Sequence, residues 1–86
     1  MNSLKLEYTF ADFMSALAFI NQVAKLAEEA DHHPDVHLTG YKHVMLELTT
    51  HSAGGTVTQK DRDLAAKIES LVKGRTDVSA KSTSNR

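Results

Sequence analysis

The sequence predicts an α+β fold, an antiparallel sheet of three to four strands with two helices packed on one face. Two stretches alternate apolar and polar residues, which is the period of a strand with one buried face. Two others repeat apolar residues every three or four positions, which is the period of an amphipathic helix. Over 86 residues this pattern favours a single domain, residues 1–74, followed by a polar tail, residues 75–86.

The first predicted strand leads directly into the first helix. Apolar and polar side chains alternate over residues 4–10, and the apolar residues that follow recur at helical spacing. Thr9 is expected to be the N-cap of this helix, with Asp12 completing a capping pair. Pro34 disfavours helical geometry at the residue before it, so the helix should end near Asp31.

A second strand is predicted over residues 43–51, with an apolar face turned inward and a polar face that should line solvent or a cleft. The turn at residues 52–55 ends it, and a short returning strand is expected at residues 56–57. Thr58 is then expected to cap the second helix, with Asp61 at the third helical position. The buried stripe of that helix consists of Leu64, Ala65, Ile68, Leu71 and Val72.

Residues 75–86 are polar, rich in Ser, Thr and Lys, and without periodicity, so we expect a disordered tail. Ten basic and eleven acidic residues give a net charge of −1, which does not suggest nucleic-acid binding. The absence of cysteine excludes a disulfide scaffold. No stretch approaches the roughly 20 apolar residues of a membrane span, and the N-terminus has no signal-peptide run. We therefore expect a soluble, cytoplasmic protein that binds neither nucleic acid nor membrane.

Three histidines mark the candidate site. His32 and His33 follow the first helix, and His51 ends the second strand. The histidine side chain has an unperturbed pKa of about 6.5, so it exchanges protons near neutrality. Each of the three stands at the end of an element, where side chains converge on a cleft, which favours proton transfer over a solvated loop role.

An alternative hypothesis is a histidine-rich metal site, because His37 and His43 could add imidazole ligands for zinc, nickel or copper. Adjacent histidines diverge, however, and no spacing here matches a zinc signature such as H-E-x-x-H. We therefore expect no metal. For His37 and His43 we prefer solvated positions.

Three further residues could have either a structural or a functional role. Asp61 can be explained by capping alone, unless it also presents the helix start to a ligand. Tyr41 would either stack on a ring or pack within a strand. Glu28 stands against the helix dipole, which hints at a local partner such as Lys25 or a histidine.

Taken together, the spacing of Glu28, His32-His33-Pro34, Tyr41, His51 and Asp61 resembles the signature of the pterin-4a-carbinolamine dehydratases, also called 4a-hydroxytetrahydrobiopterin dehydratases. The flanking residues agree, and the resemblance runs from about residue 4 to residue 72. The family's usual N-terminal helix and first strand have no counterpart before residue 4, so the resemblance implies an N-terminally truncated version. Val36 and His37 stand where family members often carry an aromatic residue.

The resemblance implies dehydration of a 4a-hydroxytetrahydropterin to a quinonoid dihydropterin, in the recycling of tetrahydrobiopterin after aromatic amino-acid hydroxylation. It implies His32, His33 and His51 as catalytic residues, and we expect His32 and His51 to transfer protons while His33 positions the substrate. The implied substrate-binding residues are Glu28, Pro34, Tyr41, Thr49, Thr50 and Asp61. No cofactor is implied, because the pterin is itself the substrate.

The resemblance also bears on partners. Unpaired strand edges recruit other strands, so we expect residues 4–10 to pair with another chain and the protein to be a homodimer or homotetramer. An aromatic amino-acid hydroxylase would be its metabolic neighbour. The alternative is a non-catalytic family member that acts as a protein-binding or dimerisation module. Retention of every signature residue favours the enzyme.

Overall fold

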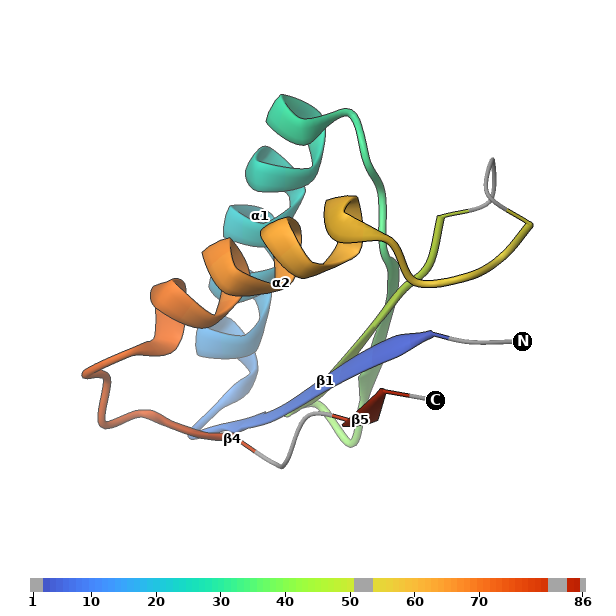
Figure 1. Ribbon diagram of the computed structural model, residues 1–86. Coiled ribbons are helices and arrows are strands. Elements are labelled where there is room, and N and C mark those ends of the chain that lie inside the picture. The colour runs from blue at the N-terminus through green and yellow to red at the C-terminus, as the bar shows by residue number, and fades with distance from the viewer. Residues whose placement is uncertain (1–2, 51–53, 81–83, 86) are drawn as a thin grey trace.

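The computed structural model describes residues 3–50, 54–80 and 84–85. All its strands join one antiparallel sheet of order β2-β3-β1-β4, with β5 also paired to β1, and both helices cover the same face (Figure 1). The elements are β1 Leu4–Phe10, α1 Phe13–Ala30, β2 Asp35–Thr39, β3 His43–Leu48, α2 Gln59–Val72, β4 Val78–Ala80 and β5 Ser84–Asn85. The predicted α+β class is confirmed, with more strands than expected.

The core lies between the central strands and the helices. The register of β1 against β3 sets Leu6 opposite Leu46, so alternate residues of both strands face the helices. Phe19 of α1 is fully buried, with its ring centroid 5.1 Å from that of Tyr8 and 5.0 Å from that of Phe10. The buried cluster consists of Leu4, Leu6, Tyr8, Phe10, Ala16, Phe19, Val23, Val44, Leu46, Leu48, Leu64, Ala65 and Ile68.

The N-cap of α1 is one point where the sequence-based prediction is wrong. The cap is Asp12, whose carboxylate Oδ1 accepts a hydrogen bond from the backbone N–H of Ser15 at 2.8 Å. Thr9 cannot serve because β1 extends as far as Phe10. Its hydroxyl instead lies 3.0 Å from Nδ1 of His43 on the neighbouring strand.

The other helix ends lie where the sequence predicts them. α1 ends at Ala30, and Asp31 turns the chain out of the helix at a left-handed φ of 50°. α2 follows its N-cap Thr58. Gly74, just after α2, has a φ of +81°, a conformation that glycine adopts without the steric cost of a Cβ.

Strand β2 was not predicted, because the sequence of residues 34–42 indicated a loop. Only Val36 and Leu38 are apolar in it, and most of its side chains are exposed. It forms because its backbone pairs along β3, from Asp35 opposite Glu47 to Thr39 opposite His43. An edge strand of this kind depends on its neighbour's backbone groups more than on its own side chains.

We expected a disordered tail over residues 75–86, and in the residues that it describes there the structure places strands β4 and β5. β4 and β5 both pair with β1. The guanidinium of Arg75 donates two hydrogen bonds to the Asp77 carboxylate, at 2.9 and 2.6 Å, and Val78 packs against the core. The edge of β1 expected to be free for another chain is therefore largely covered from within.

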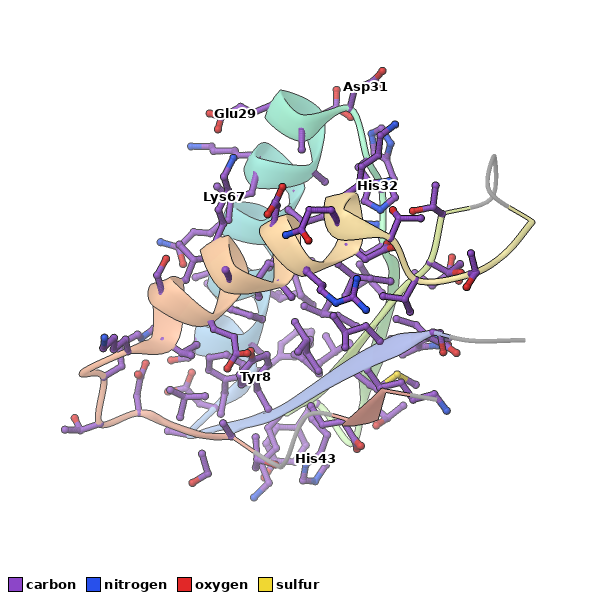
Figure 2. All side chains as sticks on the ribbon, viewed as in Figure 1. Tyr8, Glu29, Asp31, His32, His43 and Lys67 are labelled. Atoms are coloured by element: carbon purple, nitrogen blue, oxygen red, sulfur yellow. The ribbon has the colours of Figure 1, made fainter. Side chains whose placement is uncertain are left out.

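One buried polar atom gives a stability prediction. The Tyr8 side chain lies between the sheet and the helices (Figure 2), and its hydroxyl finds no hydrogen-bond partner in the described part of the chain. Burial, aided by the charge of Glu69, raises the pKa of Tyr8 to about 12. Tyr8→Phe keeps the ring and removes the stranded hydroxyl, so it should raise the free energy of unfolding by about 1 kcal/mol.

Urea unfolding at pH 7 measures this change, with exposed Tyr41→Phe as the matched control. Because the pKa of Tyr8 is higher in the folded chain, the wild type should also lose stability as the pH rises from about 10 to 12, and Tyr8→Phe should lack this loss. A Tyr8→Phe variant less stable than the wild type would show that the hydroxyl has a partner after all.

Candidate functional site

Several of the predicted site residues come together where the chain leaves α1 and enters α2. Pro34 keeps the preceding residues out of the helix, and the backbone N–H of His32 donates to the Ala27 carbonyl at 3.1 Å. This turn sets the His32 side chain against the first turn of α2, as Figure 2 shows. The two adjacent imidazoles thereby enter different surroundings.

His32 belongs to a buried hydrogen-bond network centred on Asp61. Its Nε2 lies 2.6 Å from Oδ1 of Asp61, whose side chain is fully buried. The other carboxylate oxygen, Oδ2, accepts hydrogen bonds from the Thr50 hydroxyl and from the Thr58 backbone N–H, both at 2.8 Å. The hydroxyls of Thr50 and Thr58 lie 2.6 Å apart. Thr50, just after β3, and Thr58, the N-cap of α2, thus hold the carboxylate that contacts the His32 imidazole.

The electrostatics of this network determine which nitrogen of His32 carries a hydrogen. Burial opposes ionisation of Asp61, but hydrogen bonds from Thr58, His32 and Thr50 together hold its pKa below the usual value for aspartate. An ionised carboxylate only accepts hydrogen bonds, so Nε2 of His32 must donate to it. Nδ1 is then the nitrogen that can exchange a proton with a bound molecule.

His33 forms a separate and more exposed pair. Its Nε2 lies 2.6 Å from Oε2 of Glu28, so the local partner that was expected for Glu28 is a histidine. Both side chains are exposed and line a groove of about 170 Å³ between α1 and β2. The apolar residues of the groove are Ile20, Val23, Ala24, Ala27, Pro34 and Val36. The groove is smaller than the roughly 300 Å³ at which small-molecule pockets begin.

Not every predicted site residue joins this cluster. Tyr41 is exposed in the turn after β2, at a φ of 58°. The five residues of β2, roughly 17 Å of strand, separate it from Pro34, so one chain does not bring it to the histidines. Thr49 is half-buried just after β3. His51 lies outside the described residues, and its role stays a prediction.

Thr58 is the network member that the site prediction missed. Sequence reasoning assigned it to helix capping alone, although the Thr58-x-x-Asp61 spacing that predicts the cap also predicts the contact with Asp61. A cavity of about 290 Å³, larger than the groove between α1 and β2, lies away from the cluster. It is lined by residues of β1 and β3 and by Thr39 of β2, and none of the predicted site residues lines it.

Within the described residues, no group of three or more His, Cys, Asp or Glu side chains is placed to hold a metal ion. Neither of the helices described is long and apolar enough to cross a bilayer.

Comparison with known proteins gives one consistent family. Residues 1–71 match the family model described as Pterin 4 alpha carbinolamine dehydratase. A protein of Acidobacterium capsulatum named "Putative pterin-4-alpha-carbinolamine dehydratase" is 54% identical over 63 residues, which cover 73% of this chain and 66% of that protein. One of the same name from Thermomicrobium roseum is 53% identical over 64 residues, 74% of this chain and 67% of that protein. The chain thus spans about two thirds of the length of the curated relatives it matches.

Solved structures agree on the fold. The crystal structure of a transcriptional coactivator/pterin dehydratase from Brucella melitensis has a TM-score of 0.73 and 36% identity, and the match covers 80% of this chain and 71% of that one. A pterin dehydratase-like protein described as a RuBisCO assembly factor in the alpha-carboxysome has a TM-score of 0.68, with 83% and 80% covered. At 24% identity, that second likeness bears on the fold alone.

Proposed function

Since this chain belongs to the pterin 4 alpha carbinolamine dehydratase family, we propose that it dehydrates a 4a-hydroxytetrahydropterin to a quinonoid dihydropterin and water. The reaction would take place in the cytoplasm, in tetrahydrobiopterin recycling after aromatic amino-acid hydroxylation. The observation that supports this function most directly is the contact of His32 with the buried, ionised Asp61. It gives an imidazole of defined tautomer in the stretch that carries the family signature.

The reaction requires one general acid and one general base. The C4a–O bond breaks and the hydroxyl leaves as water, so a general acid must protonate the departing oxygen. The N5–H bond is lost at the same time, and its electron pair forms the new C=N double bond. A general base takes the N5 proton, so the two transfers balance and no net charge develops on the pterin.

The proposed roles follow from the two environments. His32 exchanges a proton through Nδ1, while Asp61 acts as a positioning residue that holds the Nε2–H tautomer and the ring orientation. His51 is the second proton-transfer group by family resemblance. His33, held by Glu28 beside the apolar groove, contacts and orients the substrate rather than exchanging the reacting protons.

The test is a stopped-flow assay that follows loss of 4a-hydroxytetrahydropterin generated by an aromatic amino-acid hydroxylase. Because the substrate also dehydrates unaided, the rate with protein is compared with the rate in buffer. His37→Ala is the matched control, since His37 is an exposed histidine on β2 outside the cluster. We expect wild type and His37→Ala to accelerate the reaction equally. A rate equal to that in buffer would refute the proposal.

Protein binding without catalysis is the second candidate. It draws on the solved relative described as a transcriptional coactivator/pterin dehydratase. The same assay, together with calorimetric titration by a stable dihydropterin, separates the two. Absence of both acceleration and pterin binding would favour the binding module.

A further inference from the structure

Both hydrogens that Thr50 can donate are taken up inside the chain. Its hydroxyl donates to Oδ2 of Asp61 at 2.8 Å, and its backbone N–H donates to the Thr56 carbonyl at 2.9 Å. Its own carbonyl accepts from the N–H of Gly55 at 3.1 Å, and the residue is only 5% exposed. The hydroxyl expected to contact the substrate is therefore directed to the carboxylate that contacts His32.

The hydrogen bonds of this network run in one direction. The hydroxyl oxygens of Thr50 and Thr58 lie 2.6 Å apart, a distance that does not say which one donates. Burial opposes ionisation of Asp61, but its hydrogen bonds hold the pKa below the usual value, so the carboxylate only accepts. The single hydroxyl hydrogen of Thr50 points to Asp61. Thr58 therefore donates to Thr50, and Thr50 donates to Asp61.

Two donors on one oxygen fix the orientation of the Asp61 carboxylate. Oδ2 is held by the Thr50 hydroxyl, just after β3, and by the Thr58 backbone N–H at the start of α2. Because these donors come from different elements, the carboxylate cannot turn about its Cβ–Cγ bond without losing one of them. Oδ1 is thereby kept 2.6 Å from Nε2 of His32. Hydrogen bonds behind a site residue lock its side chain in one geometry in this way.

Burial makes each of these hydrogen bonds important. Asp61 is fully buried and the His32 side chain is 12% exposed, so water does not readily replace a donor that is lost. The pair of His33 and Glu28 differs, since its side chains are 58% and 76% exposed and water can replace either partner. The orientation of His32 therefore depends on its protein partners more than that of His33 does.

We propose that the hydroxyls of Thr50 and Thr58 are positioning groups for the dehydration, which hold Asp61 so that His32 keeps its hydrogen on Nε2 and presents Nδ1 to the substrate. Thr50 acts through Asp61, and Thr58 acts through Thr50. Neither hydroxyl binds the pterin. This role rests on the proposed function, since the proton that His32 exchanges is that of the pterin reaction.

The kinetic test compares Thr50→Val with Thr50→Ser. Valine keeps the branched shape but removes the hydroxyl, so kcat should fall by about tenfold while KM stays unchanged. Serine keeps the hydroxyl and should restore kcat. Thr56→Val is the matched control, because Thr56 meets Thr50 through its backbone carbonyl and should keep the wild-type kcat. A raised KM with unchanged kcat would overturn the proposal, because it would place the Thr50 hydroxyl on the substrate.

A spectroscopic test does not depend on activity. A ring N–H that is bonded to a buried carboxylate gives a downfield proton resonance that exchanges slowly with water, and His32→Gln identifies the resonance of His32 by its absence. In Thr50→Val this proton should exchange roughly fivefold faster, because one hydrogen bond that holds the carboxylate is lost. In Thr50→Ser and Thr56→Val it should exchange as in the wild type. An unchanged exchange rate in Thr50→Val would refute the positioning role.

The two tests separate this role from the proposed function. If the wild type does not accelerate dehydration while Thr50→Val still speeds exchange of the His32 proton, the proposed function fails, whereas the positioning of His32 by Thr50 is supported. If circular dichroism shows that Thr50→Val is unfolded, Thr58→Val decides. It keeps the backbone N–H that donates to Asp61 and removes only the hydroxyl that donates to Thr50. It should speed the same exchange, with Thr58→Ser as the wild type, and an unchanged rate would count against both hydroxyls.

Discussion

His32→Gln is expected to lower the kcat of pterin dehydration by about 100-fold or more while leaving the chain folded. The glutamine amide can still donate a hydrogen bond to Asp61, so the buried carboxylate keeps a partner. It cannot exchange a proton near neutral pH, and general acid–base catalysis typically contributes 10²- to 10⁴-fold. The hydroxylase-coupled assay measures kcat, and thermal unfolding shows whether the fold persists.

His33→Ala is the matched comparison for this prediction. If His33 positions the substrate, its loss should act mainly on KM, with a smaller effect on kcat than that of His32→Gln. The pair of variants therefore tests the division of roles between adjacent residues. Full activity in His32→Gln would show that the proton passes through another group. A kcat loss in His33→Ala equal to that in His32→Gln would remove the distinction between them.

The second large effect is expected at Asp61. Asp61→Ala should lower the free energy of unfolding by roughly 3 kcal/mol, because it leaves the His32 ring, the Thr50 hydroxyl and the Thr58 N–H without their buried acceptor. Urea unfolding at pH 7 measures the change. Asp63→Ala is the matched control, since Asp63 is exposed on the same helix and should change stability by less than about 0.5 kcal/mol.

The pH dependence tests the same network. The pKa of Asp61 is lower in the folded chain than its ordinary value of 3.8, so its ionisation favours folding at pH values above about 4. That contribution should be lost as the pH falls through the pKa of the folded state. The stability difference between the wild type and Asp61→Asn should therefore shrink below about pH 4. A difference that stays constant down to pH 2 would mean that the charge of Asp61 does not stabilise the fold.

Much of the site could be predicted from local sequence. Pro34 ends α1 and leaves His32 and His33 on a constrained turn. The Thr58-x-x-Asp61 spacing starts α2 with a carboxylate against its first N–H groups. Both are short-range effects, set by backbone dihedral angles and by hydrogen bonds that span three or four residues. They place these side chains at the ends of their helices, and the family signature identifies them as candidate site residues.

The partners of those side chains could not be predicted in the same way. Adjacent histidines have the same local signal, yet His32 meets Asp61, which is 29 residues away in the sequence, while His33 meets Glu28. Only the packing of α2 against the end of α1 decides between them. Tyr41 shows the opposite outcome. The family spacing suggests that it lies near the turn after α1, but strand β2, which was not predicted, separates it from that turn.

The sequence by itself determined the α+β class, the inward faces of β1 and β3, and the ends of α1 and α2 near the site. These features follow from side-chain periodicity and capping, which act over a few residues. Only the tertiary structure decided that β2 and β4 exist, that β1 has both edges paired, and that the side chain of His32 is largely buried whereas that of His33 is exposed. Edge strands and buried hydrogen-bond networks draw their stability from groups far away in the chain, and a local pattern does not contain that information.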